Sequence, residues 1–167
     1  MNRNILIGIF SSLILTFLLQ GQSFEQSKAN NWHQWRGPEA NGVTRTANPP
    51  LTWSENENIR WKVAIDGKGN SSPLIWKDKV FILTAYDTGK VDPKLAKPED
   101  QPDRMFGIQH PNTTYKFITL CLDRETGKEL WRRTATEVVP HEGHHPDNSF
   151  ATASPTTDGD SLYCWFG

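Results

Sequence analysis

Apolar residues after residue 23 fall into short runs that have the period of a β-strand. Residues 59–65 alternate apolar with polar or small side chains, which predicts a strand with one buried face. The side chains of that predicted face are Ile59, Trp61, Val63 and Ile65. No ten-residue stretch after Ser23 keeps a helical period, so we expect an all-β fold.

Four further apolar runs are separated by turn residues. Lys77-Asp78-Lys79 separates the first two runs and predicts a hairpin. The last two runs flank Gly127, which can take the positive φ of a tight turn without steric cost. The four runs cover residues 74–76, 80–85, 115–122 and 129–134.

The chain contains a diverged internal repeat. Ser72 aligns without gaps on Ser154, and a tryptophan followed by a base precedes each copy, at Trp61 and at Trp131. When two insertions are removed, the period is about 43 residues, close to the roughly 40 to 50 residues of a four-stranded propeller blade. The repeat therefore favours a propeller over other all-β folds.

The longer of the two insertions covers residues 87–113. It is rich in charges, shows no apolar period and contains four prolines, so we expect a long surface loop. Long loops on a rigid scaffold often carry binding functions, which makes the charged part at residues 87–104 a candidate partner contact. The prolines are Pro93, Pro98, Pro102 and Pro111.

The first 23 residues follow the pattern of a cleaved secretory signal. One arginine precedes a nearly unbroken apolar run over residues 5–19, and Gly21 and Ser23 supply small residues for cleavage. A membrane anchor is the alternative, but this run is shorter than the roughly 20 residues that span a bilayer. We therefore expect an exported protein, periplasmic or extracellular, without stable membrane insertion.

Charge and cysteine content narrow the possible functions. The 167 residues carry 18 basic and 19 acidic side chains, so the chain lacks the cationic excess that nucleic-acid binding requires. Cys121 and Cys164 each lie in an apolar run, and we expect both to be small buried hydrophobes. A disulfide between them is the alternative in an oxidising compartment.

Residues 121–131 contain the pattern with the most information. Asp123 can accept hydrogen bonds from turn amides, Thr126 and Gly127 reverse the chain, and Trp131 offers a large flat surface for docking. The run resembles the tryptophan-docking signature of quinoprotein-like β-propellers built from pyrroloquinoline quinone (PQQ) repeats, with Cys121 in place of the usual alanine. Residues 31–38 and 139–146 also resemble secreted bacterial proteins of this type.

The resemblance implies a ring of about seven or eight four-stranded blades, more than this chain can supply. It identifies the chain as an N-terminal fragment of a PQQ-like β-propeller repeat protein. Residues 59–167 are then one to two blades of an incomplete ring, and residues 24–58 are an N-terminal extension or clasp. The rest of the ring is then the first expected partner.

A histidine-rich segment follows the docking motif. Residues 141–145 satisfy His-Glu-x-x-His, a zinc-protease pattern that requires a helix to direct both imidazoles at the metal. Pro140 and Pro146 flank the segment, and proline disfavours a helix there. We interpret the segment as a polar loop and keep a loop metal site at His141, His144 and His145 as the weaker alternative.

No catalytic residue can be assigned from the sequence. The resemblance also includes quinoprotein dehydrogenases, which hold PQQ over the ring axis beneath a disulfide between adjacent cysteines. This chain has no adjacent pair of cysteines. We expect no cofactor, with PQQ as the exception to test. The expected function is a non-catalytic scaffold for a protein or small-molecule partner; the alternative is part of a PQQ-dependent dehydrogenase of alcohols or sugars.

Overall fold

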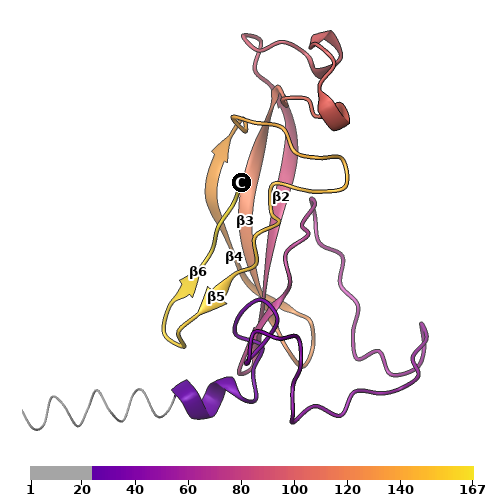
Figure 1. Ribbon diagram of the computed structural model, residues 1–167, viewed down its shortest axis with the longest axis vertical. Helices are drawn as coiled ribbons and strands as arrows, with labels where there is room; N and C mark the ends of the chain where they lie inside the picture. Colours follow the sequence, from indigo (N-terminus) through magenta and orange to yellow (C-terminus); the bar gives the residue numbers. More distant parts are fainter. Residues whose placement is uncertain (1–23) are drawn as a thin grey trace, which may run out of the picture.

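A four-stranded antiparallel sheet forms the body of the computed structural model, which describes residues 24–167 (Figure 1). The strands follow one another in space as they do in sequence, each paired with its predecessor. The fold is therefore all-β, as the strand periods predict. The strands are β1 (Leu74–Trp76), β2 (Lys79–Val91), β3 (Thr113–Asp123) and β4 (Glu129–Val138).

A second, smaller sheet lies beside the first (Figure 1). It is the hairpin of β5 (Thr156–Thr157) and β6 (Leu162–Tyr163), in which Thr156 pairs with Tyr163. In the described part of the chain, helical structure is limited to residues 24–28 and two 3-10 turns, η1 (Pro98–Asp100) and η2 (Met105–Gly107). Within residues 24–167, no helix has the length and apolar character needed to cross a membrane.

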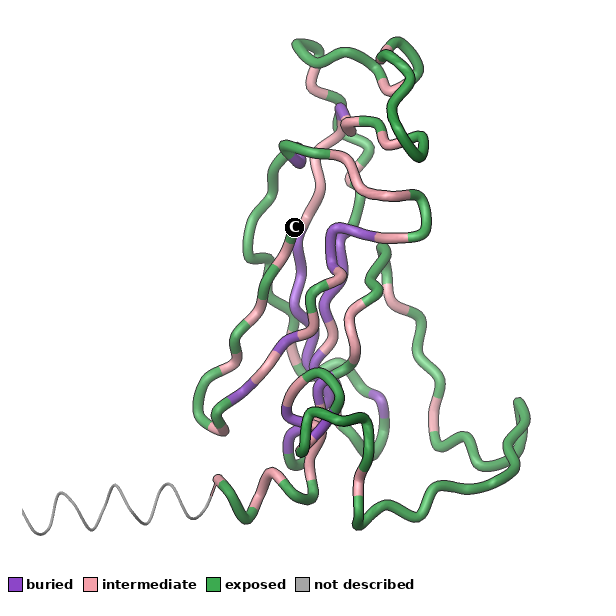
Figure 2. Tube along the Cα trace, in the orientation of Figure 1, coloured by how far each residue is buried: buried purple, intermediate pink, exposed green. Residues whose placement is uncertain are grey.

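One face of the four-stranded sheet packs against the C-terminal part of the chain. Phe81, Leu83 and Ala85 of β2 lie on this face because alternate side chains of a strand point the same way. They are buried together with their β3 neighbours and with Phe150 and Ala151, which approach from outside the sheet (Figure 2). The half-buried side chains that complete this core include Cys164, Phe166 and Leu162.

The opposite face of the same sheet is buried as well. Val80 and Thr84 of β2 point to this side, opposite Leu122 and Ile118 of β3, and all four side chains are buried. The hydroxyl of Thr84 donates a hydrogen bond to the carbonyl oxygen of Asp66, 2.8 Å away. A sheet with two buried faces needs cover from both sides, and here residues before β1 contribute one cover and residues after β4 the other.

The predicted strand at residues 59–65 does not form. The segment pairs with no strand in the part of the chain described, so its backbone groups have no ladder to join. Ile59 and Val63 are exposed, and only Trp61 and Ile65 of the predicted face are half-buried. The segment does alternate apolar and polar residues. Its apolar side chains are not buried together, because no neighbouring strand covers them.

The boundaries of the first insertion differ from those expected. β2 continues through Val91 and β3 begins at Thr113, so both ends of the predicted loop belong to the sheet. Gly89, at a φ of 70°, accompanies a bulge in this extension of β2. Residues 92–112 form the actual loop, which lies at one end of the sheet and is largely exposed (Figures 1 and 2).

The N-terminal segment links the two sheets. Trp32 forms an antiparallel backbone bridge with Ile75 of β1, and the neighbouring carbonyl oxygen of His33 accepts a hydrogen bond from the amide of Thr157 in β5. The hydroxyl of Thr156 donates to the same oxygen at 3.2 Å. Residues 32–33 therefore join β1 to β5 through backbone hydrogen bonds.

Candidate functional site

The turn between β3 and β4 is organised around one carboxylate. Oδ1 of Asp123 accepts hydrogen bonds from the amides of Glu125 and Thr126 and from the hydroxyl of Thr126, at 3.1, 2.8 and 2.7 Å. The amide of Gly127 donates to the Asp123 carbonyl oxygen at 2.9 Å. These hydrogen bonds, led by that from the Thr126 hydroxyl, lower the pKa of Asp123.

This turn forms a seat for the indole of Trp61. The ring lies against Gly127, where an added Cβ would come within 2.6 Å of it. The indole N–H donates to the carbonyl oxygen of Arg124 at 2.9 Å, and Arg60 forms an ion pair with Glu125 beside the ring. Glycine is required at this position for two reasons. Its φ is 72°, which other residues rarely adopt, and the Trp61 ring occupies the space that a side chain would need.

Trp131 occupies a different environment. It pairs with Cys121 in the β3–β4 ladder and packs at a tilt on Phe81, with ring centroids 5.9 Å apart. The side chain is half-buried, and its indole N–H has no hydrogen-bond partner among residues 24–167. Of the predicted docking motif, the structure therefore joins Asp123, Thr126 and Gly127 in one turn and places Trp131 on the sheet face.

The ring that fills the turn belongs to Trp61, which the motif itself does not contain. Its role was missed because it precedes the motif by sixty residues. The available signal was the pair of residues that follows at both places, a tryptophan and then a base, at Trp61 and again at Trp131.

The histidine-rich segment is a loop, without the helix that zinc-protease geometry requires. His144 directs Nδ1 at the carbonyl oxygen of His145, 2.7 Å away, and its ring meets Phe150 edge-on. The His145 Nδ1 accepts a hydrogen bond from the amide of Asp147 at 3.2 Å, and its ring contacts Phe106. His141 is exposed. Across the described chain, no three His, Cys, Asp or Glu side chains are grouped as metal ligands.

A cavity of about 440 Å³ borders this loop. Phe117, Val138, Phe150 and Phe166 give it apolar walls, while His144 contributes a polar edge. The two histidines with defined contacts use Nδ1 for the local backbone, which orders the loop. The segment therefore acts as one wall of a cavity in this structure.

Both cysteine thiols are free. Cys121 is fully buried in the core and Cys164 is half-buried, where its sulfur accepts a hydrogen bond from the hydroxyl of Thr119 at 3.6 Å. Burial raises the pKa of each thiol. The two cysteines lie in separate core clusters and serve as small buried side chains, so the alternative of a bridge is not what the structure shows.

An aromatic cluster anchors the N-terminal segment. The rings of His33, Phe24 and Trp76 form a triangle: the imidazole of His33 is 5.5 Å from Phe24 and 6.4 Å from Trp76 between ring centroids, and Phe24 and Trp76 are 5.4 Å apart. Among residues 24–167, the buried Nδ1 atom of His33 and the buried indole nitrogen of Trp76 have no hydrogen-bond partner. Burial lowers the pKa of His33, the charge of Lys28 acts in the same direction, and Glu25 opposes both. The ring is therefore held neutral, as an apolar site requires.

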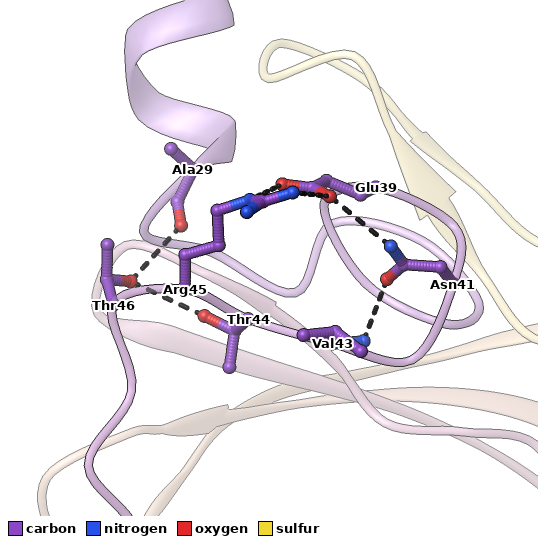
Figure 3. A network of polar contacts seen from close by, with 7 residues as sticks. All are labelled: Ala29, Glu39, Asn41, Val43, Thr44, Arg45 and Thr46. Atoms are coloured by element: carbon purple, nitrogen blue, oxygen red, sulfur yellow. Dashed lines mark hydrogen bonds and ion pairs between the residues drawn. The ribbon is translucent and has the colours of Figure 1, made fainter.

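A polar network orders the exposed loop that follows (Figure 3). The guanidinium of Arg45 contacts both carboxylate oxygens of Glu39, at 2.7 and 3.3 Å, and Asn41 donates to the same carboxylate. These hydrogen bonds, with that from Arg45 the largest influence, lower the pKa of Glu39. The network satisfies its own charges, so it shapes the loop and leaves no group free for chemistry.

Comparison with known proteins assigns no family. No family model and no solved structure matches the chain. The bovine protein called DNA excision repair protein ERCC-6-like (Bos taurus) is 27% identical over 120 residues, which cover 66% of this chain. The matched region spans only 9% of that bovine protein. The similarity therefore carries neither a family nor an activity to this chain.

Replacing Gly127 with alanine tests the seat of Trp61. Gly127→Ala is expected to lower the free energy of unfolding by about 1 to 3 kcal/mol more than Gly89→Ala. Both glycines have nearly the same positive φ, but a Cβ at Gly89 meets nothing within 4 Å. Urea denaturation followed by tryptophan fluorescence gives the comparison. Equal losses for the two variants would show that the ring does not occupy this turn.

The Asp123 turn is expected to weaken in acid. Hydrogen bonds to the carboxylate hold its pKa below the unfolded value, so its contribution to stability is present above about pH 4 and is lost as pH falls further. The stability difference between the wild type and Asp123→Asn should therefore shrink from pH 6 to pH 2. Urea midpoints at several pH values measure it, with Asp103→Asn, an exposed residue, as the control. A difference that does not change with pH would contradict the assignment.

Proposed function

We propose that this chain forms the first part of an exported PQQ-like β-propeller that serves as a non-catalytic binding scaffold. The observation that carries the proposal is the seat of Trp61 on the turn at residues 123–127. A ring of radial sheets needs a repeated contact that joins each sheet to the next. A tryptophan from one repeat unit, seated on the turn of the following unit, is such a contact.

The alignment of the repeat supports this arrangement in three dimensions. Ser72 and Ser154, which are equivalent positions of the two copies, meet directly: the Ser72 amide donates to the Ser154 hydroxyl oxygen at 2.9 Å. The amides of Asn70 and Ser71 both donate to the carbonyl oxygen of Ala151, just before the second copy. Contact between equivalent positions is expected when neighbouring blades pack around a common axis.

Trp131 then has a defined task. It stands in the repeat where Trp61 stands, its face packs on Phe81, and its indole N–H is unpaired within the described residues. By equivalence with Trp61, this N–H would donate to a turn carbonyl oxygen of the next unit. Its partner in the proposal is the rest of the ring.

The proposed role is binding, without a catalytic centre or cofactor in this chain. The Nδ1 atoms of His144 and His145 are engaged by the local backbone, which favours an ordering role for these two rings over proton transfer. Two irregular segments lie toward the same end of the sheet: the loop at residues 92–112 and the loop that follows β4 (Figure 1). A rigid sheet that presents long loops at one end, without a cationic excess, suits a protein or small-molecule partner better than nucleic acid.

An oxidation assay separates the scaffold from the alternative, a PQQ-dependent dehydrogenase. We expect no dye reduction when the purified protein receives PQQ, calcium and a panel of alcohols and sugars, because the chain lacks the adjacent cysteines of those enzymes. A known quinoprotein dehydrogenase serves as the positive control. Turnover that depends on PQQ would replace the scaffold with the enzyme.

Export is tested with residues 1–23, which lie outside the described residues. Fused to a phosphatase reporter that needs disulfides to be active, they are expected to give activity and a mature protein that begins at Phe24. Leu15→Arg, which interrupts the apolar run, should abolish both. Equal activity without residues 1–23 would contradict export by this segment, and an uncut fusion held in the membrane would favour the anchor.

A further inference from the structure

A second cavity lies between the 92–112 loop and the chain that leaves β4. Its volume is about 460 Å³, within the range of small-molecule sites. Leu95, Pro111 and Val139 give it an apolar wall, and Arg104 and His141 stand on its lining. None of the lining residues is acidic. The cavity therefore combines an apolar surface with one cationic side chain, that of Arg104, and with imidazole groups.

The loop that forms this cavity is internally braced. The side-chain amide of Gln101 donates to the His110 carbonyl oxygen at 2.8 Å and accepts from the His110 amide at 2.9 Å. At the base of the loop, the amide of Asp92 donates to the carbonyl oxygen of Asn112 at 2.8 Å. Because these hydrogen bonds already hold the loop in place, little conformational entropy of the loop is lost when a ligand binds, which favours binding.

Arg104 is the one permanent charge among the lining residues. Its Nη1 lies 2.7 Å from Nε2 of His110, and because a guanidinium only donates, the imidazole nitrogen accepts. That bond engages Nε2 of His110 and leaves its Nδ1 as the other ring nitrogen. Arg104 forms no ion pair with a carboxylate in the described chain, so most of its donors remain available beside the apolar wall.

We propose that this cavity binds a small organic carboxylate with an apolar body. The planar guanidinium of Arg104 matches a carboxylate, and the apolar wall at Leu95 and Val139 would cover the rest of the molecule. Because a bare inorganic anion would leave that wall unused, an anion with an apolar body is the preferred class. The inference rests on the proposed scaffold, to which it assigns a class of ligand.

The wild-type chain is titrated with benzoate and with benzyl alcohol, a neutral molecule of similar shape, by isothermal calorimetry. Benzoate is expected to bind, and benzyl alcohol to bind about tenfold more weakly or not at all. Inorganic phosphate, which lacks the apolar body, should also bind more weakly than benzoate. Equal binding of benzoate and benzyl alcohol, no binding of benzoate, or tighter binding of phosphate would each overturn the proposal.

Two variants of lining residues, Arg104→Gln and Leu95→Ser, test where benzoate binds, and Arg133→Gln is the control. Arg104→Gln should weaken benzoate binding about tenfold, whereas Arg133→Gln, an exposed arginine of β4, should leave it unchanged. Leu95→Ser, at a half-exposed position, should weaken benzoate without changing the charge. Equal effects of the two arginine variants would overturn the site. The dye-reduction assay is independent of benzoate: a scaffold that fails to bind it stays a scaffold, and PQQ-dependent turnover would not abolish a carboxylate site.

Discussion

The sheet of β1 to β4 has two apolar faces, and both must be kept from water. This constraint explains why the segments before and after the sheet lie where they do. Residues such as Leu83 on one face and Leu122 on the other are almost fully buried, and each such side chain contributes about 1.5 to 3 kcal/mol when it leaves water. A single flat sheet cannot bury both of its faces, so it needs a neighbour on each side. The contacts at Trp61 and at Phe150 are the local means by which these neighbours are held.

The contacts that join the neighbouring segments to the sheets share one feature. Each gives a hydrogen-bond partner to a backbone group that would otherwise lack one. The indole of Trp61 uses the Arg124 carbonyl oxygen inside a turn, and residues 32–33 use the free edges of β1 and β5. Buried backbone groups must find partners, so these bonds fix the approach of each segment as well as its attachment. The apolar area supplies the attraction between the segments, and the hydrogen bonds supply its geometry.

The division between sheet and loops also explains where binding is proposed. The strands use their side chains for packing and leave few groups free, whereas residues 92–112 are braced by Gln101 and hold Arg104 beside an apolar wall. A long insertion can acquire such a site without disturbing the sheet, because its ends are tied at Asp92 and Asn112. The histidine-rich loop shows the same division between loop and sheet. Its imidazoles order the backbone beside a cavity, while the side chains of the neighbouring strands form the apolar core.

The strand periods were enough to predict an all-β fold, the β1–β2 hairpin, the β3–β4 turn and the burial of Cys121, because each depends on residues close together in the chain. Tertiary structure alone decided the rest. The alternation at residues 59–65 formed no strand because no partner strand lies beside it, and β2 ran on to Val91 because β3 was there to pair with it. The turn at Gly127 received a tryptophan from a distant segment, and His33 became buried against Phe24 and Trp76. Local sequence patterns determine which backbone conformations a segment favours. Strand pairing and burial depend on which distant segment packs against it, and the spacing of residues along the sequence does not specify that segment.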